Sequence, residues 1–360
     1  MNLKFNQRFV KFLQNESIPI IDVCNTTMKT ATSTLLRLNG SAISKLCLED
    51  ICLIPRVPCV LSDCSNSWKA SHSWTPDALL SKYANSEFEC GRISATEPNL
   101  LTLKHYLAYC ESVAHALTCT SDNPMYLFDA EFAEGWNTSA DLAHDYTVPE
   151  QFTDDLFCTL RADLRPDYRW LIIGPKGSGT YLHVDPLCTS AWNTLISGYK
   201  KWVILEPLEN ESVSVSNVDC YDEKGGGDRP SIAEWFERTL HGDQFENTGD
   251  NVVKIETLYG KGFVFTQQPG ETVFVPWGWQ HAVLNLPGNP AAAKAEHGSP
   301  AIAVTHNFIP KRSIAQVDGF LNAARQENKR WTPGDLSAIE AAVRRSVLGY
   351  ADRTCATCAL

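Results

Sequence analysis

Nine short apolar segments, separated by turns rich in Gly and Pro, occupy most of the chain between about residues 126 and 310. Each is long enough for a strand and too short for a typical helix. Chains with many short strands and Gly/Pro turns form antiparallel sandwiches or barrels, so this pattern predicts a mainly β fold. The segments are MYLFDA, YRWLIIG, TYLHVDP, SAWNTLIS, KKWVILEP, GFVFTQ, ETVFVP, HAVLNL and AIAVTHNF.

Amphipathic patterns on both sides of this region predict helices. Three phenylalanines between residues 5 and 12 recur at helical spacing. Thr75 followed by Pro76 has the form of a helix start, because threonine caps a helix and proline fits its first turn. Residues 52–63, in contrast, are predicted to be extended, since two prolines interrupt them. We expect helices over residues 4–14, 76–86, 101–119, 313–328 and 335–352.

The strand series has two interruptions. Residues 208–260 combine a polar, Gly-rich stretch with SIAEWFERTL, a predicted helix, and we interpret them as an insertion between two strands. Residues 286–300 form a second, shorter loop of low complexity. We therefore divide the chain into an N-terminal helical and irregular segment (1–54), a β domain (55–312) and C-terminal helices (313–360).

Charge and cysteine content limit the partners and the compartment. The chain of 360 residues has a net charge of −11 and no basic patch, so we expect no direct binding to nucleic acid and none to anionic membranes. Its 13 cysteines are an odd number in a chain much longer than small disulfide-stapled domains, which favours reduced thiols. No apolar run reaches the length of a signal peptide core or a membrane span. We expect a soluble protein of the nucleus or cytoplasm.

His183 and Asp185 lie two residues apart in the strand segment TYLHVDP. Because side chains alternate along a strand, an imidazole and a carboxylate at this spacing are expected on one face. The same spacing recurs in His241 and Asp243, but these follow a predicted helix and have no strand around them. Only the first pair is therefore a metal-site candidate.

A third ligand candidate is His281, in the segment GETVFVPWGWQHAVLNL. Two histidines and one carboxylate from two strands form the facial triad that suits non-haem Fe(II). This triad leaves three coordination positions open, two for a bidentate 2-oxo acid and one for O2. A satisfied core histidine and a structural zinc site remain as alternatives on spacing alone.

The motifs GPKGSGTYLHVDPLCTSAWNTLISGYKKWVILEP, GETVFVPWGWQHAVLNL and AIAVTHNF resemble the Jumonji-C family of Fe(II)- and 2-oxoglutarate-dependent oxygenases. Within that family the chain is most similar to the lysyl hydroxylase and arginine demethylase group formerly called the phosphatidylserine receptor. The resemblance extends over roughly residues 55–310 and includes PCVLSDCSNSWKA and NPMYLFDAEFAE. It implies a double-stranded β-helix, a cupin-like jelly roll, with flanking N- and C-terminal helices.

The resemblance also implies roles for individual residues. His183, Asp185 and His281 match the catalytic iron ligands of the family. Lys200 matches the lysine that binds the distal carboxylate of 2-oxoglutarate. Further polar residues match the surroundings of that co-substrate, and alternation in AVTHNF places the last two of them on one face. These residues are Asn193, Thr180, Tyr126, Thr305 and Asn307.

The sequence departs from the family pattern in three places. Cys188 replaces a glycine, which either narrows the substrate side of the pocket or packs as a small apolar side chain. The basic C-terminal extension of the nearest group is missing, which argues against a role with nuclear RNA. The chain instead closes with Cys355 and Cys358, and a single C-x-x-C pair is weak support for zinc.

The resemblance implies a dioxygenase that hydroxylates a protein side chain, with lysine as the leading substrate and with Fe(II), 2-oxoglutarate and O2 as cofactor and co-substrates. Demethylation of N-methyl-arginine or N-methyl-lysine uses the same chemistry and stays open. So does hydroxylation of a translation termination factor, the reaction of a sister group that shares IPRVPCVLSDC. A non-catalytic cupin-fold scaffold is the alternative of another class.

The apolar pattern of the expected C-terminal helices indicates that two copies of the chain associate. Leu336, Ile339, Val343 and Val347 lie on one face of the helix expected over 335–352. If the barrel leaves part of this face uncovered, a second copy can cover it. We therefore expect a homodimer through the C-terminal helices.

Overall fold

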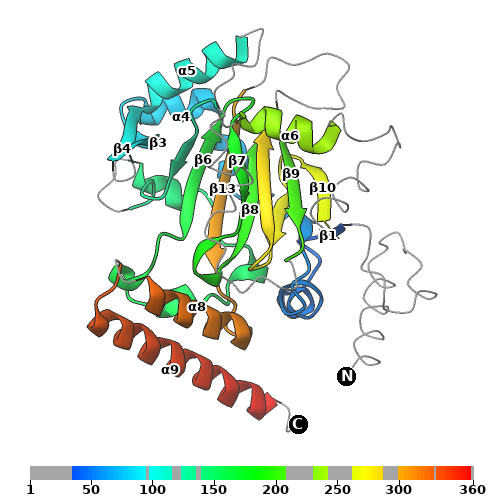
Figure 1. Ribbon diagram of the computed structural model, residues 1–360, viewed down its shortest axis with the longest axis vertical. Coiled ribbons are helices and arrows are strands. Elements are labelled where there is room, and N and C mark those ends of the chain that lie inside the picture. The colour runs from blue at the N-terminus through cyan, green and yellow to red at the C-terminus, as the bar shows by residue number, and fades with distance from the viewer. Residues whose placement is uncertain are drawn as a thin grey trace, which may run out of the picture.

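The computed structural model describes residues 35–94, 97–115, 123–134, 139–207, 230–241, 262–286, 299–327 and 330–357. Two β-sheets pack against each other in the centre, and helices flank them (Figure 1). This is the arrangement of a double-stranded β-helix, so the predicted mainly β fold with flanking helices is confirmed. The helix expected over residues 4–14 lies outside the described residues.

The larger sheet has seven strands. All its neighbouring strands are antiparallel except the edge pair β1 and β2, which is parallel. In spatial order the strands are β1 (Leu36–Asn39), β2 (Cys59–Ser62), β11 (Thr272–Val275), β8 (Ser190–Ser197), β13 (Ala301–Phe308), β6 (Arg169–Gly174) and β5 (Leu127–Asp129).

The smaller sheet has four antiparallel strands. In spatial order they are β10 (Gly262–Gln267), β9 (Lys200–Leu205), β12 (Gln280–Asn285) and β7 (Gly179–His183). Along β9 the side chains alternate as a strand requires. Val203 and Leu205 pack towards the helix α6 (Ile232–His241), whereas Trp202 and Ile204 join the core between the sheets.

The outer face of the larger sheet packs on elements from the first half of the chain. Val304 and Phe308 of β13 belong to this outer cluster, whereas Ala301 and Ala303 face the interior. The covering helices are α2 (Lys45–Leu48), α3 (Ala70–Ser73), α4 (Pro76–Tyr83) and α5 (Leu103–His115). The predictions of helices near 76–86 and 101–119 are confirmed with shorter bounds, and Thr75 caps α4 by accepting a 3.2 Å hydrogen bond from the Ala78 amide.

Two strands that were not predicted form a separate hairpin before α5. They are β3 (Glu87–Ser94) and β4 (Glu97–Thr102). The hairpin takes the first two residues of the helix expected over 101–119. Phe88 and Cys90 are buried in this hairpin, whereas Ile93 and Leu100 are exposed. Only some of its apolar residues therefore lie on a buried face.

The expectation of an extended segment over 52–63 is wrong in its first half. Cys52 and Leu53 are buried at the end of a π-helical turn, η2 (Glu49–Leu53), and the chain becomes extended only at β2. Pro55 and Pro58 lie between the two elements. Since proline lacks an amide donor, the helical turn ends before them.

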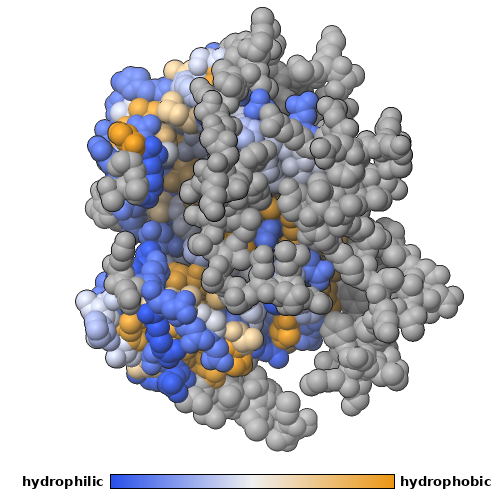
Figure 2. All heavy atoms as spheres, viewed as in Figure 1, coloured by the Kyte–Doolittle hydropathy of each residue, from blue (hydrophilic) through white to orange (hydrophobic). Residues whose placement is uncertain are grey.

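The C-terminal helices α8 (Ile314–Gln326) and α9 (Pro333–Thr357) are present as predicted and lie at one end of the barrel (Figure 1). Phe320 and Ile339 belong to an apolar cluster that these helices share with the short helical turn η5 (Leu156–Thr159). Figure 2 shows mixed polar and apolar side chains over this end of the molecule. Three further 3₁₀ turns are η3 (Ala140–His144), η4 (Glu150–Phe152) and η6 (Ala162–Leu164). Within the described part of the chain, no helix combines the length and the hydrophobicity needed to cross a bilayer.

Candidate metal centre

His183, Asp185 and His281 converge at one end of the smaller sheet. β7 ends at His183, and its antiparallel pairing with β12 places His281 directly opposite. The Oδ1 atom of Asp185 lies 3.9 Å from Nε2 of each histidine. One ligand atom from each residue falls within 4.8 Å of the others, so the three side chains can hold a single metal ion.

The reason expected for this convergence is partly wrong. We expected His183 and Asp185 to lie in one strand and to share a face through its alternation, but the strand ends at His183. Asp185 itself is extended and precedes the 3₁₀ turn η7 (Pro186–Cys188), in which Leu187 and Cys188 both have positive φ angles, 56° and 53°. The carboxylate keeps its direction because Asp185 continues the extended backbone by two residues before the chain turns.

Backbone carbonyl groups orient both imidazoles. Nδ1 of His183 lies 2.7 Å from the Tyr181 carbonyl oxygen, and Nδ1 of His281 lies 3.4 Å from that of Trp279. A proton on each Nδ1 satisfies these contacts and leaves the Nε2 lone pairs free, on the side of Asp185. This is the tautomer that a metal ligand requires.

The charge state of the trio also fits a cation. Burial, followed by the neighbouring His183, holds the pKa of His281 well below its ordinary value, so this ring is neutral. Burial raises the pKa of Asp185, whose Oδ2 is buried without a hydrogen-bond partner. A buried carboxylate oxygen without a donor is costly, and a divalent ion would satisfy it.

The competing His241 and Asp243 do not form a site among the described residues. His241 is the last residue of α6, and Asp243 lies outside the described part of the chain. The second cysteine of the terminal pair, Cys358, also lies outside it. In the described ranges the trio is the one group of His, Cys, Asp and Glu side chains close enough to bind a metal.

Lys200 of β9 is a buried amine on the strand next to β12. Its Nζ donates a 3.1 Å hydrogen bond to the Tyr126 hydroxyl, and no ion pair joins it to a carboxylate of the described residues. Burial lowers the pKa of Lys200 to about 7. Lys201, next in the strand, lies on the opposite face with Val203, so the predicted alternation is confirmed.

The remaining predicted residues lie on strands that surround these two groups. Asn193 and Thr305 face each other in the pairing of β8 with β13, and the Thr305 hydroxyl donates 2.9 Å to the Trp192 carbonyl oxygen. Asn307 donates 3.0 Å to the Thr189 hydroxyl. A separate interaction of Asn307 with the Asp185 carboxylate partly offsets the rise in the pKa of Asp185 that burial causes. Thr180 lies in β7 opposite Val283.

Two polar residues of the interior were missed by sequence reasoning. Gln267, at the end of β10, and Asn285, at the end of β12, both lie opposite Lys200 in their strand pairs. Both are buried, and Asn285 donates 2.9 Å to the Ser178 hydroxyl. The sequence offers one signal for both residues, because each is a polar residue in an apolar strand segment. A single sequence does not show which strands pair, so it does not show that both residues lie opposite Lys200.

Arg56 and Trp277 form an unpredicted contact, and Trp277 lies four residues before His281 in the sequence. The Arg56 guanidinium lies 4.0 Å from the centre of the Trp277 ring and donates 2.9 Å to its carbonyl oxygen. Cys188 directs its sulfur at Gly319 of α8, where an added Cβ would lie 3.0 Å away. This position supports the reading of Cys188 as a packing side chain.

Comparison with known proteins identifies relatives for this arrangement. Residues 170–294 match the family model described as "JmjC domain, hydroxylase". The chain is 35% identical over 263 residues to the bifunctional arginine demethylase and lysyl-hydroxylase psr-1 of Caenorhabditis elegans, covering 73% of this chain and 58% of the relative.

Two further relatives have other names. Identity is 36% over 260 residues with the lysine-specific demethylase JMJ21 of Arabidopsis thaliana, covering 72% of this chain and 24% of the relative. It is 26% over 303 residues with the human 2-oxoglutarate and iron-dependent oxygenase JMJD4, covering 78% and 63%. The chain thus spans less than two thirds of each of these relatives.

Proposed function

This chain carries a JmjC domain, and on that basis we propose that it is an Fe(II)- and 2-oxoglutarate-dependent dioxygenase that hydroxylates a protein side chain, with lysine as the leading substrate. One observation carries the proposal. A partly buried His/Asp/His trio lies at the end of the smaller sheet, and on a neighbouring strand of that sheet lies a buried lysine with no anionic partner among the described residues. The first fits a divalent metal, and the second fits the far carboxylate of a 2-oxo acid.

His183, Asp185 and His281 are the proposed iron ligands. Three protein ligands on one face of an octahedron leave the opposite face open for other ligands. Bound Fe(II), together with 2-oxoglutarate and O2, supplies the oxidising power for attack on a C–H bond. The chain's own contribution is to aim the two imidazoles through the carbonyl groups of Tyr181 and Trp279 and to keep the buried His281 ring neutral.

Lys200 and Tyr126 are the proposed partners of the distal carboxylate of 2-oxoglutarate. An ammonium group buried in an apolar barrel is stable only when a negative group or several dipoles face it. The Tyr126 hydroxyl supplies one dipole, and the carboxylate would supply the charge. Asn193, Thr305, Asn307 and Thr180 are proposed to complete the polar lining of the pocket.

A demethylase is the second candidate function. The names of the relatives include arginine demethylase and lysine-specific demethylase as well as lysyl-hydroxylase and oxygenase. Hydroxylation of an N-methyl carbon gives an unstable product that loses the carbon, so both outcomes need the same metal centre. A non-catalytic scaffold is disfavoured, because it has no need for a buried lysine aligned with a metal trio.

The test measures conversion of 2-oxoglutarate to succinate by the purified full chain supplied with Fe(II). We expect succinate formation by the wild type and none by Asp185→Ala. A mass-spectrometric comparison of proteins from cells with and without the enzyme should then show a gain of one oxygen on lysine, or a loss of methyl groups. A wild-type protein that binds Fe(II) and forms no succinate, alone or with cell extract, would contradict the proposal.

We also propose that the protein works in the nucleus or cytoplasm. Support comes from the eight cysteines whose side chains the structure describes, all of which are free thiols. The proposed partner is a protein substrate, without direct contact to nucleic acid. Imaging of the tagged full chain should show it inside the cell, and recovery from the secreted fraction would contradict this assignment.

A further inference from the structure

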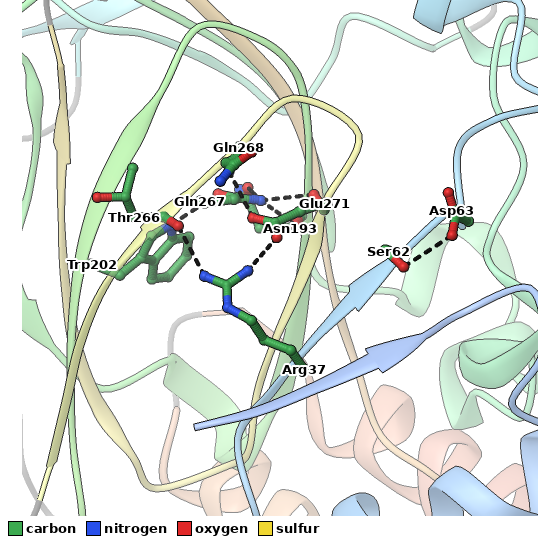
Figure 3. A network of polar contacts seen from close by, with 9 residues as sticks. All are labelled: Arg37, Ser62, Asp63, Asn193, Trp202, Thr266, Gln267, Gln268 and Glu271. Carbon is green, nitrogen blue, oxygen red and sulfur yellow. Dashed lines mark hydrogen bonds and ion pairs between the residues drawn. The ribbon is translucent and has the colours of Figure 1, made fainter. Parts of the chain in front are cut away.

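A buried amide joins the two sheets next to the proposed co-substrate pocket (Figure 3). The amide belongs to Gln267, the last residue of β10, which is fully buried. We propose that Gln267 is a positioning residue that holds Asn193 and Trp202 in the orientation needed for 2-oxoglutarate and metal binding. This inference rests on the function proposed above, and nothing in the family comparisons assigns it.

Each polar atom of this amide has a defined partner. Its Oε1 accepts a 2.9 Å hydrogen bond from Nε1 of Trp202. Its Nε2 lies 3.0 Å from the Asn193 carbonyl oxygen, 3.4 Å from Asn193 Oδ1 and 2.9 Å from the Glu271 carbonyl oxygen. A flipped amide would set its NH2 against the indole N–H, so one orientation of Gln267 is fixed.

The position of Gln267 connects it with the proposed site from two directions. It lies directly opposite Lys200 in the pairing of β10 with β9. Its partner Trp202 stacks on the ring of His281, with centroids 6.1 Å apart and an interplanar angle of 24°. Its other partner, Asn193, belongs to β8 of the opposite sheet. The Gln267 amide therefore contacts Trp202, which stacks on a proposed metal ligand, and Asn193, which is proposed to line the co-substrate pocket.

The turn after Gln267 is itself held from outside (Figure 3). Arg37 of β1 forms an ion pair with Glu271 and donates a 3.1 Å hydrogen bond to the Thr266 carbonyl oxygen. The Glu271 carboxylate accepts 2.7 Å from the Gln268 amide. These contacts tie the turn to β1 and close it internally, which gives the Gln267 side chain a braced backbone from which to position its partners.

Filling space between the strands does not by itself explain a glutamine at position 267. Trp202, Phe265 and Val273 belong to the apolar cluster between the sheets, but an apolar side chain at position 267 would leave the Trp202 indole N–H and two backbone carbonyl oxygens without this partner. The Gln267 amide satisfies these three groups and at the same time fixes their directions. The distinction between orientation and packing is measurable, because packing alters stability while orientation alters ligand binding.

The experiment compares Gln267→Met with Gln268→Met in the full chain. Methionine preserves the length of glutamine and removes its hydrogen bonds. Gln268 is the matched control, because it is adjacent and exposed and contributes only backbone atoms, its N–H and its carbonyl oxygen, to the network. The 2-oxoglutarate dissociation constant is measured without O2 on the Fe(II)-loaded protein, from the charge-transfer absorption of the complex. The ligand-field spectrum of the Co(II)-loaded protein reports on His281 independently.

For Gln267→Met we expect roughly 10-fold weaker 2-oxoglutarate binding, as the loss of one or two neutral hydrogen bonds implies. The Co(II) spectrum should shift as well, since the indole against His281 is released. Gln268→Met should match the wild type in both measurements. If Gln267→Met does not fold, Trp202→Phe is used, which retains a stacked ring and removes the indole N–H. It should change the Co(II) spectrum and alter 2-oxoglutarate binding by less than about 3-fold.

The outcomes separate the two proposals. A wild-type protein that shows no 2-oxoglutarate binding with Fe(II) contradicts the proposed function. If the wild type binds and Gln267→Met gives the same dissociation constant and Co(II) spectrum as Gln268→Met, only the positioning role is overturned. A lower melting temperature of Gln267→Met without a change in either measurement has the same meaning, because it shows a packing role.

Discussion

At the scale of single residues, the most informative group is the Lys200 ammonium. It is fully buried and has the Tyr126 hydroxyl as its hydrogen-bond partner among the described residues. A charge in this position adds little to folding, because burial removes it from water without an opposing charge. Its physical rationale is therefore an anionic ligand, and this makes its removal a direct test.

We predict that Lys200→Ala raises the apparent KM for 2-oxoglutarate by roughly 10-fold or more, the equivalent of a charge-assisted hydrogen bond of about 1.5–3 kcal/mol. Iron affinity should stay unchanged, since Lys200 does not touch the trio. Lys201→Ala, on the other face of β9, should have little effect on KM. The reverse result would show that the strand faces are assigned wrongly.

A pH dependence follows from the pKa of about 7 for Lys200. Below pH 7 the amine is protonated and can attract the carboxylate, so affinity for 2-oxoglutarate should be constant there. Above pH 7 the neutral amine must first take up a proton, and affinity should fall by up to about 10-fold per pH unit. Titration calorimetry from pH 6 to 9 measures this slope. Lys200→Arg, which stays charged, should bind without it.

Asp185 gives a prediction about both activity and stability. Asp185→Ala should abolish turnover and retain the fold, because the barrel core is apolar and independent of the metal. The metal-free variant should melt at the same temperature as the metal-free wild type or higher, since a buried carboxylate oxygen without a partner is removed. His241→Ala serves as the control and should remain active. An equal loss of turnover in Asp185→Ala and His241→Ala would show that the metal ligands are assigned wrongly.

The sequence was sufficient to predict those site residues that lie in a local motif. His183 and Asp185 are two residues apart, and His281 and Lys200 match known positions in apolar strands. Gln267 could not be found this way. Its role depends on strand pairs that join residues far apart in the chain, and one sequence contains no record of that pairing.

At the scale of elements, the turn between β8 and β9 sets the register of the pocket. Gly198 is in this turn with φ of 82°, and an added Cβ would lie 2.7 Å from Cα of Ala301. Asn193 precedes the turn and Lys200 follows it, so a shift here would move both polar residues.

We predict that Gly198→Ala destabilises the protein by about 2 kcal/mol or more in urea unfolding, because a left-handed backbone and a backbone clash combine. Gly270→Ala is the matched control. It has a similar φ of 85° but nothing within 4 Å of the added Cβ. It should lose only about 1 kcal/mol. Equal losses would show that the clash with Ala301 is relieved by movement of β13.

The elements themselves were predictable where the apolar pattern was complete. All nine strand segments of the barrel are strands in the structure, since they are buried on at least one face. The β3–β4 hairpin was missed for two reasons. The alternating buried positions are only Phe88 and Cys90, which is too few to indicate a strand, and exposed apolar residues nearby do not follow the alternation. The parallel pairing of β1 with β2 depends on a partner strand about twenty residues away, a distance over which local propensity carries no information.

At the scale of the whole molecule, α8 links the C-terminal helices to the metal end of the barrel. Gln316 of α8 is buried and donates 2.8 Å to the Cys188 carbonyl oxygen and 3.2 Å to the Ser190 hydroxyl. It therefore supports the turn that follows Asp185. Ile314, at the start of the same helix, is 51% exposed and is available to a second copy.

We propose a homodimer through these helices, as expected from the sequence. Light scattering should give twice the mass of one 40.0 kDa chain for the full-length protein. Truncation after Pro310 should yield a smaller and less stable particle, because it removes Phe320 and Ile339 from their cluster. A monomeric full-length protein would contradict the dimer and leave the support of Cys188 by α8 untouched.

The ion pair between Arg37 and Glu271 has a consequence for shortened forms of the chain. A form that started after residue 39 would retain every proposed metal ligand and lose the outer brace of the turn that carries Gln267. Such a form should still load iron, yet require a higher concentration of 2-oxoglutarate to work. The outer edge strand would then tune the response of the proposed oxygenase to the concentration of its co-substrate, without any contact to the metal ligands.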